Sequence, residues 1–236
     1  MLQKVLVIIP CYNEEASLPL VLTDIQAVTF KEGFNVTPLA VNDCSTDNTR
    51  QVAESFNTTV LNLPVNLGIG GAVQTGFKYA LRNKFDLAIQ LDGDGQHPPK
   101  EINKLLEAWQ QTGANVVIGS RFIDGDGFQS SFIRRIAINY LHWLNRVFAG
   151  LTIYDSTSGF RLLDKKAIAC AAASYPDDYP EPESLIQFAK AGLTIKEVPV
   201  VMSHRLGGRS SIRYGRSIYY IIKVSIAMFF TFIRKN

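Results

Sequence analysis

The feature that most constrains the fold is an alternation, through the first half of the chain, of short apolar runs with segments of helical length. The apolar runs, rich in Val and Ile, predict strands over residues 4–9, 36–41, 59–63, 86–91 and 116–119. The segments between them predict helices over residues 17–28, 46–56, 71–82 and 101–111. Strands that alternate with helices of this length form parallel, doubly wound sheets with right-handed crossovers. We therefore expect an α/β fold with a doubly wound, mostly parallel sheet.

The second half has a less regular pattern. Its expected elements are a largely apolar segment over residues 132–148, strands over 158–163 and 194–201, and a helix over 183–191. Residues 124–127 are rich in Gly and Asp and predict a mobile loop. Because the sequence contains neither an internal repeat nor a low-complexity linker, we expect one domain over residues 1–215, followed by an apolar, basic helix over residues 216–236.

The predicted strand over residues 86–91 stops at two aspartates, Asp92 and Asp94, separated only by Gly93. A strand that ends there leaves both carboxylates at its carboxyl edge, where open α/β sheets bind their ligands. Two hard oxygen donors held this close, with Gln96 as a third nearby, suit Mg²⁺ or Mn²⁺ that also binds substrate phosphates. A surface turn rich in Asp and Gly is the alternative. The buried strand before the motif favours a site for a metal and a diphosphate.

Two further strand ends are expected at the same edge of the sheet. Tyr12 follows the first strand and Asp43 the second, and in a doubly wound sheet such ends form one cleft. Tyr12 is suited to stacking on a base, and Asp43 to accepting hydrogen bonds from a base or a ribose. Residues 43–47 could instead cap the next helix; we expect Ser45 or Thr46 to do so, which leaves Asp43 for a ligand.

Net charge bears on whether the protein binds nucleic acid, and cysteine content bears on the cellular compartment in which it works. A net charge of +3 does not indicate a nucleic-acid partner, and none is expected. The three cysteines, Cys11, Cys44 and Cys170, are scattered, and no signal peptide precedes the first strand. Both observations predict a reduced, cytoplasmic protein.

The C-terminal end is both basic and apolar. From Val201 onward there are seven Lys or Arg residues and no Asp or Glu, which suits an anionic ligand or an anionic membrane surface. The apolar run over residues 218–233 is broken by Lys223 and is shorter than the roughly 18 residues expected of a span. We expect a helix that lies at the inner face of the membrane or docks on a small membrane partner protein. A helix packed into the core is the alternative.

Taken together, the motifs of the chain resemble those of the family-2 inverting glycosyltransferases. The matching segments are residues 9–15, 41–47, 66–68, 91–99, 119–121 and 155–161. The length and the run Gln96-His-Pro-Pro99 resemble the dolichol-phosphate-mannose-synthase-like branch, whose members glycosylate polyprenyl phosphates. No Gln-x-x-Arg-Trp motif is present, which counts against a processive synthase.

The resemblance implies a nucleotide-sugar transferase (GT-A) fold, with a nucleotide-binding half over residues 1–120 and an acceptor-binding half over residues 121–215. The nucleotide contacts that it implies are Pro10, Tyr12, Glu14, Asp43, Asp92 and Arg205, and the implied metal contacts are Asp92, Asp94 and Gln96. Arg205 corresponds to the diphosphate-binding arginine of the branch. The lysine expected six residues later is Ser211 here, so Arg209 or Arg213 is expected to replace it.

The remaining candidate residues depend on whether the acceptor is a phosphate, which needs cations, or a hydroxyl, which needs a base. A phosphate monoester has a second pKa of about 6, so it is already anionic and needs cations rather than a base. Candidates for acceptor binding are Arg121, Arg134, Arg161 and, in the motif that ends at Arg161, Ser158. Asp155 is expected to orient the acceptor or to act as a base, and Glu183 is the competing base if the acceptor is a sugar hydroxyl. Asp94, through the metal, completes the expected catalytic set.

These inferences predict metal-dependent, inverting transfer of a hexose from a nucleotide-diphosphate sugar to polyprenyl phosphate, for cell-envelope glycan or glycoconjugate synthesis. A homo-oligomer is compatible with the sequence. Transfer to a sugar hydroxyl of a glycan or lipid-linked saccharide is the first alternative. An inactive nucleotide-binding subunit is the alternative of another class.

Overall fold

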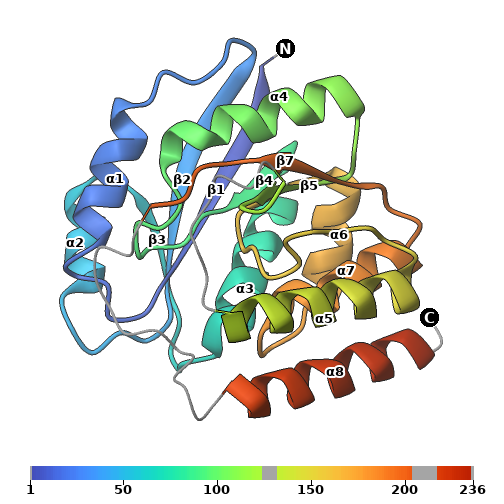
Figure 1. The fold of residues 1–236 in the computed structure, drawn as a ribbon. Helices are drawn as coiled ribbons and strands as arrows, with labels where there is room; N and C mark the ends of the chain where they lie inside the picture. The colour runs from blue at the N-terminus through green and yellow to red at the C-terminus, as the bar shows by residue number, and fades with distance from the viewer. Residues whose placement is uncertain (1, 124–131, 204–216, 235–236) are drawn as a thin grey trace.

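A computed structural model describes residues 2–123, 132–203 and 217–234 of the chain (Figure 1). At its centre is a seven-stranded sheet in the order β3-β2-β1-β4-β6-β5-β7. The strands are β1 Gln3–Cys11, β2 Phe34–Asn42, β3 Thr59–Asn62, β4 Leu87–Gln90, β5 Val116–Ser120, β6 Arg161–Asp164 and β7 Ile195–Pro199. β6 runs antiparallel to both of its neighbours, and all other pairs are parallel. The prediction of a mostly parallel sheet is confirmed.

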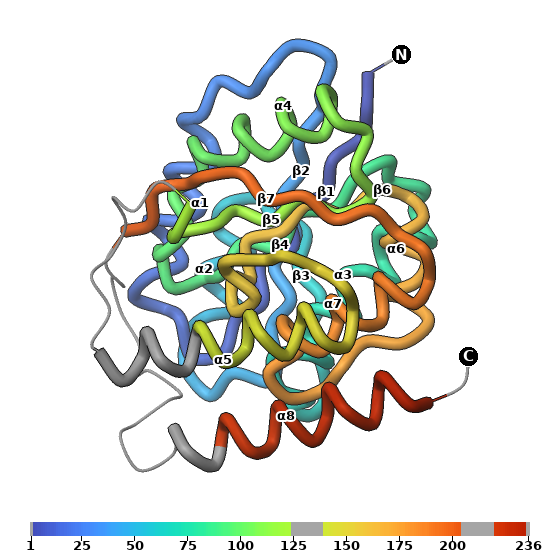
Figure 2. The backbone as a smooth tube through the Cα atoms, turned by 45° about the vertical axis from the view of Figure 1, so that its right-hand side comes forward, coloured from blue at the N-terminus to red at the C-terminus, as the bar shows by residue number. Residues whose placement is uncertain are grey.

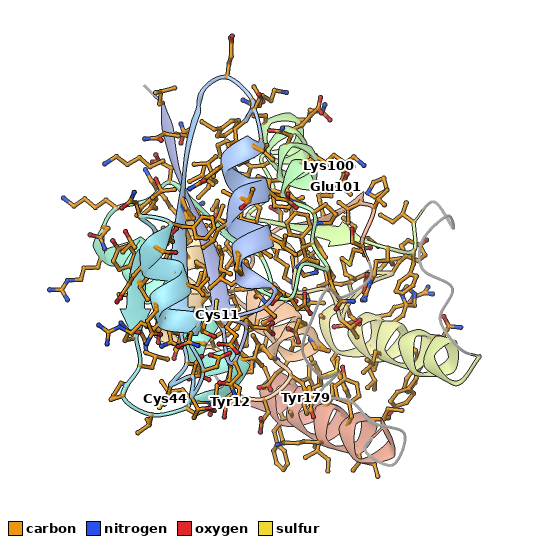
Figure 3. The ribbon with its side chains drawn as sticks, turned by 90° about the vertical axis from the view of Figure 1, so that its left-hand side faces the viewer. Cys11, Tyr12, Cys44, Lys100, Glu101 and Tyr179 are labelled. Atoms are coloured by element: carbon orange, nitrogen blue, oxygen red, sulfur yellow. The ribbon has the colours of Figure 1, made fainter. Side chains whose placement is uncertain are left out.

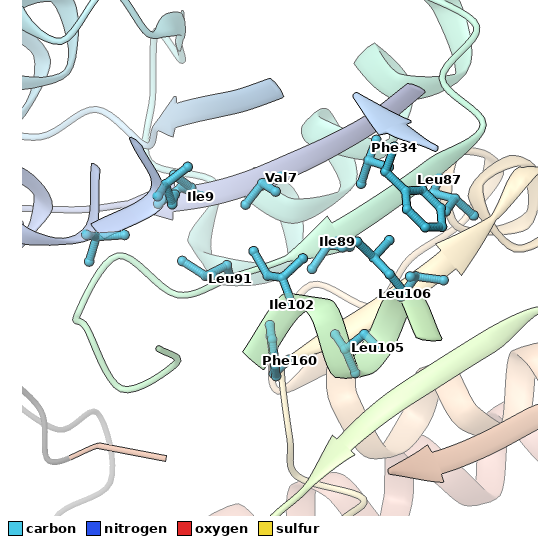
Figure 4. Packing of buried hydrophobic residues seen from close by; sticks show 14 of the residues in the cluster. Val7, Ile9, Phe34, Leu87, Ile89, Leu91, Ile102, Leu105, Leu106 and Phe160 are labelled. Carbon is cyan, nitrogen blue, oxygen red and sulfur yellow. The ribbon is translucent and has the colours of Figure 1, made fainter. Parts of the chain in front are cut away.

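Helices cover both faces of this sheet (Figure 1). They are α1 Leu18–Ala27, α2 Thr49–Ser55, α3 Gly68–Arg82, α4 Ile102–Thr112, α5 Phe132–Ala149, α6 Lys165–Ala173, α7 Pro180–Lys190 and α8 Ser217–Ile233, with a 3₁₀ turn at Pro99–Glu101. Side chains of β1 alternate between two cores, as the period of a strand requires. Val7 and Ile9 pack with α1 and α4 (Figure 4), whereas Leu6 and Ile8 pack with α3, α6 and α7. β1 and β4 therefore lie in the middle of the molecule.

Two element predictions need correction. Helix α6 was not predicted, although Asp164 provides the signal for its start, since its Oδ1 accepts a hydrogen bond from Ala167 N at 2.9 Å. The N-terminus of α2 is capped neither by Ser45 nor by Thr46: Thr49 N donates to Asp47 Oδ1 at 2.9 Å. Ser45 and Thr46 bond to Asn13 instead, so they connect the two loops at the edge of the sheet. The loop predicted at residues 124–127 lies outside the described residues.

The outermost layer consists of α5 and α8, which lie side by side over α7 (Figures 1 and 2). A small separate core joins the three helices, with Leu141 and Leu144 of α5, Ile186 of α7, and Val224 and Met228 of α8 buried in it. Among the described residues, no helix is both long enough and apolar enough to cross a membrane.

Close packing between α3 and β1 gives a test of the fold. A Cβ atom at Gly76 would lie 2.3 Å from Ile8 Cγ2 and 2.9 Å from Ile8 Cγ1, both in the core. We therefore expect Gly76→Ala to lower the free energy of unfolding by about 1–3 kcal/mol through overpacking, although Ala is normally the better helix residue. Urea unfolding measures this, with the exposed Lys78→Ala in the same helix as the control. A Gly76→Ala protein as stable as the unchanged chain would show that α3 does not pack this closely.

Candidate active site

The carboxyl ends of β1, β2 and β4 meet at one edge of the sheet, as predicted. Asp43 N, at the end of β2, donates to Cys11 O of β1 at 2.9 Å. Gly93 lies against β1 so closely that a Cβ there would be 3.2 Å from Pro10 O. Cys11, Tyr12 and Cys44 lie at the same end of the molecule (Figure 3). The Asp92-Gly93-Asp94 turn therefore lies beside the segments predicted to bind a nucleotide.

The loops after β1 and β2 form one hydrogen-bonded rim. Asn13 N donates to Ser45 Oγ at 3.0 Å, and Thr46 N donates to Asn13 Oδ1 at 2.8 Å. Glu14 accepts a hydrogen bond from Ser17 Oγ, and its backbone N–H donates to Thr49 Oγ1 at 2.8 Å. Tyr12 lies on this rim and is 50% exposed. Its ring is thus held on a rigid support and is accessible to a planar ligand.

Asp43 connects this rim to the start of α3. The carboxylate is buried, and its Oδ1 accepts a hydrogen bond from Leu67 N at 2.7 Å. Asn66 Nδ2 donates to Asp43 O at 3.2 Å. Burial raises the pKa of the Asp43 carboxyl, although the N–H groups at the start of α3 act against this. Asp43 therefore positions residues 66–68. Its contact with a nucleotide stays a prediction.

The acidic turn holds its oxygen donors in place with backbone bonds. Asp94 is 4% exposed, and its Oδ1 accepts a hydrogen bond from Gln96 N at 2.9 Å. Asp92 N donates to His97 Nδ1 at 3.2 Å, and the His97 ring stacks on Phe160 at 5.2 Å. The imidazole thus fixes the turn. Since the Asp92 side chain is 32% exposed, it faces the solvent-accessible side of this edge.

The donor set of this turn suits a hard divalent cation. It offers two carboxylates and the amide oxygen of Gln96 at alternate positions over five residues. In the part of the chain that the structure describes, no group of three or more His, Cys, Asp or Glu is arranged so that these side chains alone could hold a metal ion. Mg²⁺ and Mn²⁺ accept few protein oxygens together with water and substrate phosphates, so Asp92, Asp94 and Gln96 fit them. Gly159 preserves space beside this turn, because a Cβ there would lie 2.7 Å from Gln90 Nε2, the amide nitrogen that also lies next to Asp92.

Gln90 is a polar residue of this site that sequence reasoning missed. It is 1% exposed in β4, and its Nε2 lies 3.4 Å from Asp92 Oδ1. Its Oε1 is buried and has no hydrogen-bond partner among the described residues. A buried amide in an otherwise apolar strand, two residues before a predicted metal ligand, was the available signal. Gln90 supports the Asp92 carboxylate from the interior of the sheet.

Arg121 and Asp155, both predicted site residues, form an ion pair in which the Asp155 side chain is fully buried and that of Arg121 is 13% exposed. Arg121 Nε donates to Asp155 Oδ2 and Nη2 to Asp155 Oδ1, each at 2.6 Å. Asp155 is fully buried, and its backbone N–H donates to Glu197 Oε1 at 2.8 Å. Both carboxylate oxygens of Asp155 are thus engaged by Arg121, which does not support the predicted role of Asp155 as a base. The geometry makes Asp155 the residue that orients Arg121.

Arg161 and Ser158 hold the segment between Asp155 and β6. Arg161 is 1% exposed; its Nε donates to Ser158 O at 2.7 Å, Nη1 to Ser184 Oγ at 2.9 Å and Nη2 to Ser156 O at 2.9 Å. Ser158 Oγ donates to Gly119 O at 2.6 Å. These internal bonds do not support direct acceptor binding by either residue, which stays a prediction. Arg134 lies in α5 with a side chain outside the described part, and Arg205, Arg209, Ser211 and Arg213 also lie outside it.

The two glutamates at the start of α7 face different neighbours. Glu183 Oε1 accepts a hydrogen bond from Thr231 Oγ1 of α8 at 2.6 Å, so the predicted competing base points toward the outer helix. Burial raises the pKa of the half-buried Glu181 to about 7. The charges of Arg161 and Arg121 lower this pKa and that of Asp92 raises it, so Glu181 belongs electrostatically to the site. The sequence analysis named Glu183 alone, whose role as a base stays a prediction, and did not consider Glu181.

Comparisons with known proteins agree with this arrangement. The family model described as Glycosyl transferase family 2 matches residues 6–171. Undecaprenyl-phosphate mannosyltransferase of Micrococcus luteus is 31% identical over 226 residues, covering 90% of this chain and 88% of that protein. Polyprenol monophosphomannose synthase of Mycolicibacterium smegmatis is 28% identical over 220 residues, covering 89% of this chain and 81% of that protein.

Among solved structures, the chain is similar to glucosyl-3-phosphoglycerate synthase from Mycobacterium tuberculosis in complex with uridine diphosphate. The TM-score is 0.72 at 19% identity, over 99% of this chain and 82% of that one. The same enzyme has been crystallised with Mn²⁺, uridine diphosphate and glucosyl-3-phosphoglycerate. The fold is that of the GT-A glycosyltransferases, and the protein is a glycosyltransferase. The chain belongs to glycosyl transferase family 2, as the sequence motifs predicted.

The Arg121–Asp155 pair gives a second test. Removing Arg121 would leave a fully buried carboxylate without its cation, so we expect Arg121→Ala to lower the free energy of unfolding by about 3–5 kcal/mol. The control is Arg50→Ala, which breaks an exposed ion pair of 2.7 Å with Glu54 and should cost about 1 kcal/mol or less. Urea unfolding measures both. Equal, small losses in the two variants would mean that Asp155 is not buried against Arg121.

Proposed function

We propose that the protein transfers a hexosyl group, with inversion, from a nucleotide-diphosphate sugar to polyprenyl phosphate, using Mg²⁺ or Mn²⁺. The observation that carries the proposal is the acidic turn at the sheet edge, where Asp92, Asp94 and Gln96 lie beside the rim that bears Tyr12 and Asp43. The two relatives that match about nine-tenths of the chain are named for transfer to polyprenyl phosphates, which supports this acceptor.

Each group of residues has a part in this reaction. Tyr12 would stack on the base, and Asp43 would accept a hydrogen bond from the nucleoside. Asp92, Asp94 and Gln96 would hold the ion, which when bound supplies positive charge for the departing diphosphate. Gln90 would keep the Asp92 carboxylate in place, with Gly159 leaving the space that the site requires.

The acceptor phosphate needs a cation more than a base. One of its oxygens would form a bond to the anomeric carbon while the bond from that carbon to the donor diphosphate breaks, and the leaving diphosphate keeps the electron pair. Arg121 is suited to hold the acceptor, because Asp155 fixes Nε and Nη2 while Nη1 has no hydrogen-bond partner among the described residues. An arginine fixed in this way is already oriented for a phosphate.

The proposal predicts a specific loss on removal of one metal ligand. Incubation of the protein with a panel of nucleotide-diphosphate sugars and undecaprenyl or dolichyl phosphate should give metal-dependent release of nucleoside diphosphate and a glycosylated lipid. We expect Asp94→Asn to lower this rate on the order of a hundredfold or more, because metal-held charge stabilises the transition state. The exposed Asp24→Asn in α1 is the matched control and should keep normal activity. Undiminished metal-dependent turnover in Asp94→Asn would contradict the metal site, and no turnover with any donor would favour a nucleotide-binding subunit.

One observation favours a second candidate, transfer to a sugar hydroxyl. A hydroxyl acceptor must lose a proton, and Glu181, with a pKa raised to about 7, is the carboxyl group suited to accept it. Because its pKa is raised, Glu181 is protonated below about pH 7 and becomes a base only above it. The hydroxyl reaction would therefore slow as the pH falls through this value.

Glu181→Gln separates the two acceptors. If the acceptor is a lipid phosphate, we expect the variant to keep its rate within several-fold. If it is a hydroxyl, loss of the base should lower kcat by roughly 10²- to 10⁴-fold and abolish the decline below pH 7. The pH–rate profiles of the two proteins with each acceptor are the measurement, and Glu183→Gln is the neighbouring control. If Glu181→Gln but not Glu183→Gln lowers the rate with lipid phosphate, then transfer to the phosphate requires a base, which would contradict the proposal.

A further inference from the structure

The outer helix α8 is attached to the molecule by one of its faces. Tyr220, Val224 and Met228, spaced four residues apart, are buried against α5 and α7. Lys190 Nζ of α7 donates to Thr231 O at 2.9 Å near the end of α8. Tyr140 and Ser225 share a hydrogen bond of 3.0 Å between α5 and α8. The helix is therefore neither a free tail nor fully enclosed in the core.

The opposite faces of α8 and α5 are apolar and exposed. We call this surface the α5–α8 face; it consists of Tyr140, Trp143, Val147, Ile222, Ile226, Phe229, Phe230 and Ile233, which are 37–60% exposed. Their spacing of three or four residues places them along one side of each helix. Phe148 lies between the two rows, with its ring 6.2 Å from Phe229 and 5.2 Å from Phe232. The two helices lie side by side (Figures 1 and 2), and the contacts of Phe148 bring the apolar row of α5 next to that of α8.

The charges carried by the same two helices are all positive. Neither α5 nor α8 contains Asp or Glu, whereas both contain Lys or Arg. Arg146 of α5 is exposed, and Lys223 of α8 pairs with Asp178, which lies before α7. An apolar helical surface with Trp, Tyr and Phe and with basic residues alone is typical of helices that lie in the interface of an anionic bilayer. Soluble proteins rarely leave a contiguous apolar surface of this kind without a partner.

We propose that the α5–α8 face lies on an anionic lipid bilayer, with the two helices parallel to its plane and their exposed apolar side chains among the lipid headgroups and upper acyl chains. The positive charges attract the anionic surface, and burial of the aromatic and aliphatic side chains supplies the stable attachment. The proposal rests on this face and does not depend on which acceptor the active site uses. A second copy of the chain, covering the same face, is the competing occupant.

Trp143 provides a direct test, because the chain has two tryptophans and the other is placed elsewhere. Trp109 packs against the core, with its ring 6.2 Å from Phe34. In a Trp109→Phe chain the emission therefore reports on Trp143 alone. We expect a blue shift when vesicles of phosphatidylglycerol and phosphatidylcholine are added. The shift should be smaller at high salt, because salt screens the attraction, and smaller again with phosphatidylcholine alone. An unchanged spectrum would overturn the proposal.

Co-sedimentation with the same vesicles tests which side chains bind. We expect the double variant Ile226→Glu with Phe230→Glu to lower the partition coefficient by about tenfold or more, because it places charges where lipid contact is required. The matched control is Leu20→Glu. Leu20 is 50% exposed, and its helix, α1, lies away from α8 (Figure 1). Equal binding of the double variant and the control would overturn the proposal. So would a lipid-free dimer of the unchanged chain that the double variant dissociates. Release of nucleoside diphosphate from a soluble donor reports whether each variant is folded. If no variant releases it, the result contradicts the proposed function and not the proposal for the α5–α8 face.

Discussion

The buried guanidinium of Arg161 is the group on which the second half of the site depends. A cation that is 1% exposed must have its N–H groups satisfied within the protein, and Ser156 O, Ser158 O and Ser184 Oγ do this. These bonds fix the segment before β6 and tie it to α7. The same segment places Asp155 against Arg121 on one side and Gly159 against Asp92 on the other. The internal charge of Arg161 therefore helps to set the positions of Arg121 and of the Asp92-Gly93-Asp94 turn together.

The first half of the chain could be predicted well because its apolar runs have the length and bounds of buried strands. The direction of β6 could not, since a four-residue strand has no pattern that distinguishes parallel from antiparallel pairing. The Asp92–Asp94 turn was placed correctly because strand ends of a parallel sheet share one edge. The partner of Arg121 could not be identified, because Asp155 is 34 residues away and only the tertiary fold brings the two together.

The different surroundings of Glu181 and Glu183 have a geometric cause. The predicted helix began at residue 183, whereas α7 begins at Pro180 and includes both glutamates in its first turn. Residues two apart on a helix are rotated by about 200° from each other, so the two side chains point in nearly opposite directions, and that of Glu183 faces α8. The first turn of α7 thus belongs both to the site, through Glu181, and to the outer layer, through Glu183 and Thr231.

The strand order β4-β6-β5 has a consequence for how the protein is made. β2, β3 and β4 can pair as they leave the ribosome, because each finds a neighbour among the strands already synthesised. β5 emerges before both of its partners, β6 and β7. Its five buried residues therefore remain without a sheet until synthesis has passed β6. The nascent chain carries an apolar segment open to aggregation during this interval, and a ribosome that pauses between β5 and β6 would prolong it.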